Sequence, residues 1–600
     1  MNWDLTSYFP SFEGPETRQF MTALEDDVEV LRQRTAALAP LDEANADAWE
    51  EVVIGREDLD RRWSHLTSYI GALSAADAHN EEYAREEAAL ALLDAEFEKL
   101  NVELLRGFRD PQEGVFAAFC ARPALADCGH FLRRLREEAG WTMPADQEAL
   151  AADLGVDGLH AWGRLYESIA GKMEFEMEYP DGRREQVPMA QRRALMQNPD
   201  RRVRQAAFER GNWAWQRMED VTAAALNAIA GTRLTLNRRR GVEHFLDRAL
   251  FQAGITRQTL DAMFTAIFDQ IDVGRDILAL KAGAIGEDGI AWYDLEAPLP
   301  LAGERPSIPW EEGSGMVAAA FSKAYPALGE FTRTMYAKRW IEFEPRAGKR
   351  PGAFCTGSLL TAESRIYMTY NDTIGDVRTL AHEAGHAFHS HVIRNLRPWA
   401  QDYPMTLAES ASTFAEMILT DGLLADPSVS VADKLRVLDM ETGHAAVYLL
   451  DIPIRYEFES AFHEEREAGE VSARRLKELM AQTQRRVFGP LLADGGEDPL
   501  FWASKMHFYF TGISFYNFPY TFGYLLSRGL YGLFKQEGEA FIERYEDFLC
   551  WTGSDTAEGA ARRTLGCDLE SPDFWSEAIQ SLAAPFAQLK ALLVERSTDH

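Results

Sequence analysis

Cysteine is scarce in this 600-residue chain, and no two cysteines stand in a CxxC pair. The five that occur are odd in number and widely scattered: Cys120, Cys128, Cys355, Cys550 and Cys567. This pattern excludes the disulfide framework of a small secreted protein and a zinc site built from cysteine pairs. Few and unpatterned cysteines are typical of a reducing compartment, so we expect a cytoplasmic protein.

Long apolar runs and an excess of positive charge are also missing. No stretch of about 18 uncharged apolar residues occurs, so we expect no membrane-spanning helix. The opening residues, MNWDLTSYFPSFEGPE, lack the basic region and the apolar region of a secretory signal. Asp and Glu outnumber Lys and Arg by 95 to 62, which gives a formal net charge of −33. Because nucleic acids and anionic membranes attract basic surfaces, we expect neither as a partner.

What the chain does contain is helical periodicity. Apolar residues recur at three- and four-residue spacing over residues 16–38, 59–76 and 81–108, which predicts three long amphipathic helices. A second helical block is expected over residues 116–170, and more helices from about residue 198 to residue 281. We therefore predict a mainly α protein.

The spacing of apolar residues changes from a helical to an alternating pattern once in the first third of the chain. Residues 173–179 alternate apolar and charged side chains and lead into Pro180-Asp181-Gly182, which predicts a surface β-hairpin near residues 173–188. Such a hairpin is a plausible seam between two parts of the protein. We therefore predict an N-terminal helical domain over residues 1–195 and a second domain over residues 196–600.

The motif with the most chemical content is His382-Glu383-Ala384-Gly385-His386. Side chains four residues apart on a helix point from the same face, so both imidazoles can bind one Zn²⁺. The glutamate between them can act as general base on a water that the metal activates. Because 13 histidines in 600 residues also produce this spacing by chance in some chains, the flanking sequence has to support the interpretation.

Two histidines leave a hydrolytic zinc ion one protein ligand short. A third histidine six residues after His386 is excluded, because Val392 occupies that position. The helix predicted over residues 405–416 carries Glu409 and Glu416 on one face, among small and apolar residues that indicate burial rather than a solvated surface. A buried carboxylate needs a partner, and a metal ion would serve. We predict Glu409 as the third ligand and Glu416 as a carboxylate that supports the ligands without binding the metal.

Further histidines and a strand flank the motif. We expect His389 and His391 to orient groups or to hydrogen-bond near the site rather than to bind metal. Residues 364–370 alternate in polarity and predict a strand that leads into the helix of the motif. An edge strand can bind an extended peptide through its backbone, and we expect Tyr367 and Tyr370 to contact substrate.

Together these motifs resemble the thimet oligopeptidase-like zinc metallopeptidases of family M3, and specifically their oligoendopeptidase F branch. The resemblance rests on HEAGHAFH at residues 382–389 and LAESASTFAE at residues 407–416, and it extends over most of the chain. Further similar segments are WDLTSYFPS at residues 3–11, Arg122-Pro123-Ala124-Leu125, Tyr293-Asp294-Leu295, GKRPGA at residues 348–353 and Tyr370-Asn371-Asp372-Thr373. The resemblance implies a two-lobed helical ellipsoid with a deep substrate channel and a zincin-like HExxH core with a small β-sheet. It also implies one Zn²⁺ per chain and oligopeptide substrates.

The resemblance also implies a histidine and tyrosine cluster near the C-terminus. In this family such groups close over the substrate and stabilise the tetrahedral oxyanion, a role that a phenol O–H can fill. We expect His507, Tyr516 and Tyr524 in this role and Tyr520 as a substrate contact, with Gly512 permitting a mobile loop. An aromatic segment of this kind is also typical of a protein core.

The predicted reaction is hydrolysis of internal peptide bonds in short oligopeptides. His382, His386 and Glu409 would hold the zinc ion, and Glu383 would take a proton from the attacking water and deliver it to the leaving amine. Two alternatives stay open. One is a zinc carboxypeptidase or dipeptidyl carboxypeptidase, and the other is a catalytically silent peptide-binding scaffold. The sequence leaves the oligomeric state open.

Overall fold

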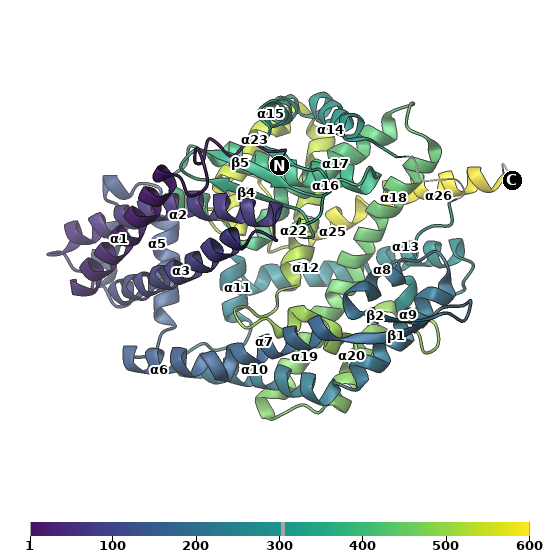
Figure 1. The fold of residues 1–600 in the computed structure, drawn as a ribbon, viewed down its shortest axis with the longest axis horizontal. Coiled ribbons are helices and arrows are strands. Elements are labelled where there is room, and N and C mark those ends of the chain that lie inside the picture. The colour runs from purple at the N-terminus through teal and green to yellow at the C-terminus, as the bar shows by residue number, and fades with distance from the viewer. Residues whose placement is uncertain (1, 302–306, 599–600) are drawn as a thin grey trace. The chain divides into compact units, whose positions relative to one another are not determined.

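A computed structural model describes residues 2–301 and 307–598, and the chain divides into two compact units. Unit 1 comprises Met1–Gly140, Arg305–Val429 and Leu526–Leu569, and unit 2 comprises Trp141–Glu304, Ser430–Leu525 and Glu570–His600. Both units are mainly helical (Figure 1), which confirms the predicted fold class. Each predicted domain is one continuous stretch of sequence, whereas each unit combines three separate stretches. The boundary near residue 195 therefore stays a prediction.

Unit 1 combines long helices with a small three-stranded sheet. Its elements are α1 (Pro15–Ala37), α2 (Ala46–Ala76), α3 (Glu81–Phe108), α4 (Glu113–Cys120), α5 (Gly129–Gly140), α14 (Trp310–Ala324), α15 (Pro326–Ala337), β3 (Ile341–Glu342), β4 (Phe354–Ser358), β5 (Glu363–Tyr367), α16 (Ile374–Ile393), α17 (Met405–Ala425), α23 (Glu539–Trp551) and α24 (Ala557–Leu565). The short 3-10 helices η1 (Pro123–Leu125) and η5 (Pro398–Gln401) connect some of them.

Unit 2 combines helices with one hairpin. Its elements are α6 (Ala145–Gly155), α7 (Ala161–Lys172), β1 (Glu174–Glu178), β2 (Arg184–Pro188), α8 (Arg192–Met196), α9 (Arg201–Gln216), α10 (Glu219–Arg240), α11 (Asp247–Ala253), α12 (Arg257–Asp269), α13 (Ile271–Ala284), α18 (Val431–Ala446), α19 (Ile452–Ala468), α20 (Ala473–Phe488), α21 (Phe501–Ser504), α25 (Pro572–Gln580) and α26 (Ala583–Thr598). Helix α22 (Phe518–Glu537) begins in unit 2 and ends in unit 1. None of the described helices is both long enough and apolar enough to cross a membrane.

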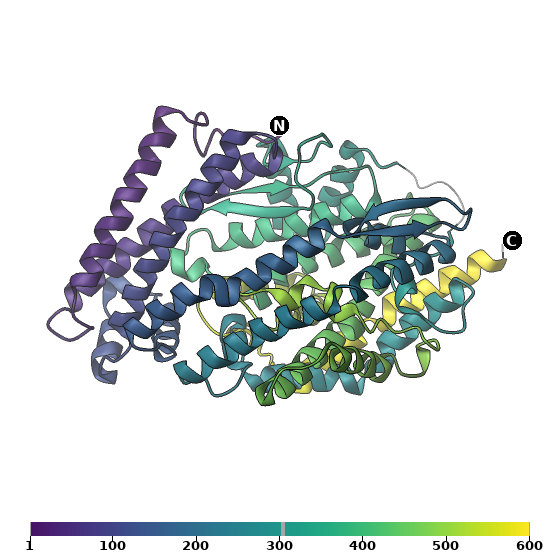
Figure 2. The same ribbon diagram turned by 60° about the horizontal axis from the view of Figure 1, so that its bottom comes forward.

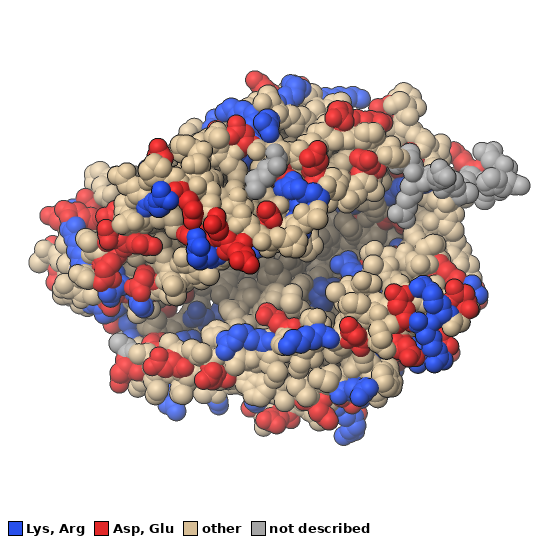
Figure 3. All heavy atoms as spheres, in the orientation of Figure 1, with Lys and Arg blue, Asp and Glu red and all other residues tan. Residues whose placement is uncertain are grey.

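The first three helices of unit 1 lie side by side (Figure 2). Their apolar stripes form one core cluster that includes Leu24 and Val28 from α1, Leu59 and Leu66 from α2, and Leu100 from α3. Each such side chain contributes roughly 1.5–3 kcal/mol when it is fully buried. On the face shown in Figure 3, acidic side chains interspersed with basic ones cover this part of the molecule, at the left. The apolar spacing thus predicts the buried faces of these helices.

The predicted hairpin is present in unit 2. Strands β1 and β2 pair antiparallel, with Glu174 opposite Pro188 and Glu178 opposite Arg184. Gly182 in the turn has φ of 84°, a left-handed conformation that glycine adopts without a steric penalty. The alternation of residues 173–179 therefore does mark a change from helix to strand.

The sheet of unit 1 leads directly into the HExxH helix. Strand β5 lies in the middle of the sheet, with β3 parallel on one side and β4 antiparallel on the other. The prediction that residues 364–370 form an edge strand is therefore wrong, because both of its hydrogen-bonding edges are already occupied. Helix α16 begins after Thr373, whose side chain accepts a hydrogen bond from the Asp376 N–H while Asp376 accepts from the Thr373 N–H. This capping box fixes where the helix starts.

Candidate metal centre

Helices α16 and α17 pack against each other at very short range (Figure 1). The closest approach is at Gly385, where a Cβ atom would stand 2.5 Å from the Ala411 carbonyl oxygen and 2.6 Å from Ser412 Cα. Only a residue without a side chain fits against a neighbouring backbone at that distance. The glycine inside the HEAGH motif thus brings the histidine-bearing helix onto the glutamate-bearing helix.

This contact assembles three potential metal ligands. His382 Nε2 lies 3.2 Å from His386 Nε2 and 3.3 Å from Glu409 Oε2, and His386 Nε2 lies 3.7 Å from Glu409 Oε2. In a tetrahedral site with metal–ligand bonds of 2.0–2.1 Å, the ligand atoms are about 3.3 Å apart. The two imidazoles and the carboxylate are therefore spaced as three corners of a zinc tetrahedron. Their side chains are 21–26% exposed, so a fourth corner remains accessible to a small molecule.

Polar partners hold these ligand atoms in place. Glu416 Oε1 lies 2.5 Å from His382 Nδ1, so that His382 presents Nε2 to the group. The other carboxylate oxygen of Glu416 accepts a hydrogen bond from Arg378 Nε at 2.6 Å. The Ser412 hydroxyl donates to Glu409 Oε2 at 2.7 Å. Glu416 thus lies next to His382 and outside the group of three, and its role as a supporting carboxylate stays a prediction.

Carboxylates dominate the electrostatics of the group. Burial disfavours a charged imidazole, but the hydrogen bond and charge of Glu416, with the charges of Glu409 and Glu383, raise the pKa of His382 to about 9. Burial and the neighbouring His382 lower the pKa of His386 to about 4. Three carboxylates around two imidazoles create a negative potential, which a bound cation would neutralise.

Glu383 stands beside the ligands with a free carboxylate oxygen. Its side chain is buried, and within the described residues its Oε2 atom has no hydrogen-bond partner. Burial, opposed by His382 and reinforced by Glu409, raises the pKa of Glu383 to about 7. A buried carboxylate with an unused oxygen next to two imidazoles is placed to exchange a proton with a small molecule in the site.

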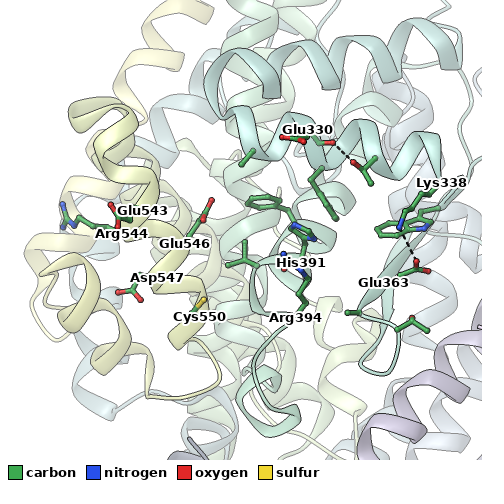
Figure 4. A pocket seen from close by; sticks show the side chains of 18 residues that line it. Glu330, Lys338, Glu363, His391, Arg394, Glu543, Arg544, Glu546, Asp547 and Cys550 are labelled. Atoms are coloured by element: carbon green, nitrogen blue, oxygen red, sulfur yellow. Dashed lines mark hydrogen bonds and ion pairs between the residues drawn. The ribbon is translucent and has the colours of Figure 1, made fainter. Parts of the chain in front are cut away.

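The two extra histidines of the helix point elsewhere. His389 is fully buried, stacks on Tyr403 with ring centroids 4.2 Å apart, and places Nε2 at 3.0 Å from the Thr552 hydroxyl. His391 lies 4.5 Å from the Phe331 ring and lines a pocket of about 1210 Å³ between α15, α16 and α23 (Figure 4). Among the described residues, neither imidazole hydrogen-bonds to His382, His386 or Glu409, although the charge of His386 acts on His389. The expected supporting role of the two histidines stays a prediction.

The two tyrosines next to the motif are structural. Tyr367 is fully buried and donates to the carbonyl oxygens of Ala75 and Arg350 at 2.9 and 2.7 Å. Tyr370 is also buried and donates to the Ile308 carbonyl at 2.9 Å. Because both hydroxyls are engaged by backbone, their positions give no support to the expected contact with substrate.

The predicted C-terminal residues form a cluster within unit 2. The rings of His507 and Tyr516 lie 5.0 Å apart, and the Tyr520 hydroxyl donates to the Tyr516 hydroxyl at 2.9 Å. Tyr524 is buried and stacks on Tyr448 with centroids 4.3 Å apart. The structure therefore brings His507, Tyr516 and Tyr520 together, and it places Tyr524 in an aromatic stack beyond them.

Comparison with known proteins shows the family. The model of peptidase family M3 matches residues 194–581, which is well over half of the chain and includes α16 and α17. The chain belongs to peptidase family M3. A second family model, described as Oligopeptidase F, matches residues 112–175. The resemblance drawn from the motifs is thus confirmed.

Named M3-type relatives cover most of the chain. An oligoendopeptidase F homolog of Lactococcus lactis subsp. lactis is 25% identical over 485 residues, which span 78% of this chain and 77% of that protein. The oligopeptidase PepF of Bacillus subtilis is 22% identical over 99% of this chain and 87% of its own length. These are distant relatives that align over 78% and 99% of this chain.

Solved structures share the M3 fold of this chain. A putative peptidase from Chlamydophila abortus has a TM-score of 0.82 at 19% identity and covers 98% of both chains. Oligoendopeptidase-F from Enterococcus faecium has a TM-score of 0.70 at 17% identity, covering 96% of this chain and 100% of its own. At such identities the likeness concerns the fold.

Three residues of this M3 site were not singled out from the sequence: Arg378, Gly385 and Ser412. Arg378 lies one helical turn before His382 and Ser412 lies one turn after Glu409, and these spacings put each on the same face as a predicted ligand. The glycine is part of the motif itself. Spacing alone could have nominated all three, but their contacts depend on how α16 meets α17.

Proposed function

We propose that this chain is a zinc-dependent endopeptidase that hydrolyses internal peptide bonds of short oligopeptides. The observation that carries the proposal is the arrangement of His382, His386 and Glu409 at zinc-ligand spacing. Beside them, Glu383 Oε2 has no hydrogen-bond partner among the described residues. Two neutral nitrogens and one carboxylate are the donor set typical of a hydrolytic zinc site.

The surrounding residues would prepare the ligands. His382 Nδ1 donates a hydrogen bond to Glu416, and a cation that binds at Nε2 would displace the proton that the raised pKa of His382 keeps there. Ser412 orients the Glu409 carboxylate through its hydroxyl. A zinc ion held by these groups would polarise a carbonyl and make water nucleophilic near neutral pH.

Glu383 would carry the proton during the reaction. Its carboxylate takes a proton from the attacking water and then delivers that proton to the nitrogen of the leaving amine. A buried position suits both steps, because a carboxylate with a raised pKa holds a proton more firmly than one in water. Glu383 therefore acts first as base and then as acid.

Stabilisation of the oxyanion by His507, Tyr516 and Tyr524 stays a prediction. Burial and the neighbouring Lys505 lower the pKa of His507 to about 4, so its imidazole is neutral at pH 7, and its one N–H, on Nδ1, is donated to Asn517 Oδ1. The phenol O–H of a tyrosine is therefore the donor of this cluster that suits a developing negative charge. Tyr516→Phe should then lower kcat with little change in KM, and equal effects on both would count against the role.

The names of the relatives support oligopeptides as the substrate class, since several are oligoendopeptidases or oligopeptidases. We therefore propose oligopeptides as the partners, in a reducing compartment such as the cytoplasm. Two rival functions remain to be tested directly: removal of C-terminal residues, and peptide binding without catalysis.

An internally quenched peptide with an amidated C-terminus separates these functions. An endopeptidase cleaves it, a carboxypeptidase does not, and a silent scaffold gives no signal. Activity should disappear with a chelator and return with zinc. Glu383→Gln should lower turnover by about 10²- to 10⁴-fold while zinc content stays at the wild-type level. Near-wild-type turnover in this variant would show that Glu383 is not the base.

A further inference from the structure

Unit 2 contains a small pocket for which the proposed reaction has no use. It has a volume of about 290 Å³ and lies between residues of α8, α13, α18, α19 and α21. Its walls are largely apolar and include Met196, Leu278, Trp292, Leu450 and Phe501. This volume is near the lower end of the range for ligand sites, so it suits a small molecule.

Three buried polar atoms among the lining residues lack partners. Arg192, Trp215 and Asp498 are 7%, 2% and 1% exposed. Within the described residues, Arg192 Nε, Trp215 Nε1 and Asp498 Oδ2 have no hydrogen-bond partner. Buried polar groups are nearly always paired in folded proteins, so two free donors and one free acceptor at one pocket indicate a bound polar molecule.

Opposite charges face each other there without touching. The Arg192 guanidinium nitrogen Nη2 lies 3.9 Å from Asp498 Oδ2, which is too far for a hydrogen bond. Each group has other partners: Arg192 donates to Asn212 Oδ1, and the second oxygen of Asp498 accepts from Asn212. The two side chains therefore form an ion pair without a direct hydrogen bond, and the Asn212 amide bridges them.

A further cation of the pocket is unpaired. The lining residues Arg193 and Arg455 form ion pairs with Glu296 and Asp451. In the part of the chain that the structure describes, Lys505 Nζ makes no hydrogen bond or ion pair, and the acids that act on its charge, Asp451 and Glu296, are paired with the two arginines. The pocket therefore has an excess of positive charge, together with one free carboxylate oxygen.

We propose that this pocket binds a free apolar α-amino acid as its zwitterion. The ligand carboxylate would accept from Lys505 and Arg192, and the ligand ammonium would donate to Asp498. The apolar side chain would lie against the Trp292 wall. A zwitterion carries its carboxylate and its ammonium group two bonds apart. This suits a small pocket in which Arg192 and Asp498 do not hydrogen-bond to each other.

The pocket is also connected to the predicted His507 cluster. Arg455 donates to Asn517 Oδ1 at 3.0 Å, and the same oxygen lies 2.7 Å from His507 Nδ1. A free amino acid that binds here would therefore be expected to change turnover. That second effect rests on the proposed function, whereas the binding itself does not.

Calorimetric titration of the full-length protein with leucine and phenylalanine tests the binding. We expect saturable binding of both amino acids. Leucinamide, which lacks the carboxylate, and N-acetylleucine, which lacks the ammonium, should each bind at least about tenfold more weakly, because each loses a charged hydrogen bond. No binding of either amino acid, or equal binding of all four compounds, would overturn the proposal.

Variants locate the site and separate it from the metal centre, where amino acids could also bind. Lys505→Met should weaken leucine binding about tenfold or more, and the matched control Lys477→Met, outside the pocket, should not. Gly443→Leu should abolish binding without unfolding, because Gly443 lines the pocket and an added Cβ meets nothing within 4 Å. Glu409→Gln should leave leucine binding unchanged even if the protein proves to be no peptidase. Binding lost in Glu409→Gln but retained in Lys505→Met and Gly443→Leu would assign leucine to the metal centre and refute the proposal.

Discussion

His382 Nδ1 and Glu416 Oε1 lie 2.5 Å apart across the contact between α16 and α17. The same carboxylate is held by Arg378, which lies one turn before His382 on α16. The connection thus runs from one helix to the other and back. It fixes the ring of His382 through a partner that does not itself belong to the group of three candidate ligands.

Replacing Glu416 by Gln tests this connection. The amide can still accept a hydrogen bond but lacks the charge, so His382 becomes a weaker ligand. We expect zinc affinity to fall by about 10- to 100-fold, as is typical when a partner of a metal-bound histidine is changed. Competition with a fluorescent zinc chelator measures the affinity. Glu311→Gln, at an exposed glutamate of the same unit, is the matched control. Unchanged zinc affinity in Glu416→Gln would show that Glu416 does not support the candidate metal site.

Gly385 sets the distance between the two helices. In Gly385→Ala the new methyl group would meet the backbone of α17 at 2.5–2.6 Å, and a backbone cannot move aside as a flexible side chain can. We expect a loss of about 1–3 kcal/mol in the free energy of unfolding, together with weaker zinc binding, because Glu409 moves away from the histidines. Thermal denaturation and zinc competition measure the two effects.

Gly315→Ala provides the matched comparison. Gly315 also lies within a helix of unit 1, but an added Cβ there meets nothing within 4 Å. This variant should be slightly more stable than wild type, by about 0.4–1 kcal/mol. If Gly385→Ala and Gly315→Ala changed the free energy of unfolding equally, the short contact at Gly385 would have no effect on stability.

Glu459 in unit 2 should make stability depend on pH. Burial, opposed by the Phe515 N–H and by Arg233, raises the pKa of Glu459 to about 7. The protonated form is therefore favoured in the folded state, and stability falls as the pH rises from about 4.5, the pKa in the unfolded chain, to about 7. The loss is on the order of 3 kcal/mol and is complete above the pKa of the folded state.

Glu459→Gln replaces the titrating carboxyl group by an amide, whose oxygen can still accept from the Phe515 N–H. In the wild type this N–H lies 2.8 Å from the carboxylate. The melting temperature of the variant, relative to wild type, should therefore be higher at pH 8 than at pH 5. Differential scanning fluorimetry at the two pH values measures the difference. An offset that is the same at both would show that Glu459 ionises as it does in water.

Local patterns predicted much of the fold and of the candidate site. The apolar spacing of α3 gave the same bounds, residues 81–108, that the structure shows. The four-residue spacing of His382 and His386 predicted a shared face, and the apolar neighbours of Glu409 predicted a largely buried helix. These features depend on residues within one or two helical turns, where helix geometry alone determines which side chains are neighbours.

What the sequence did not reveal depends on distant residues. Strand β5 is central because β3, more than 20 residues earlier, occupies its second edge, and nothing in residues 364–370 encodes that pairing. His389 bonds to Thr552, which lies 163 positions further along the chain. The start of α2 at Ala46 rather than Leu59 shows that helix boundaries, too, respond to packing that periodicity does not describe.

The central claim is that His382, His386 and Glu409 together bind one zinc ion. Its most direct test is the zinc content and zinc affinity of the purified chain and of Glu409→Gln, measured by plasma mass spectrometry and chelator competition. The account predicts one zinc ion per chain in the wild type and affinity lowered by more than about 100-fold in the variant, beyond what loss of an outer partner causes. Wild-type zinc affinity in Glu409→Gln, or a fully active protein without zinc, would contradict it.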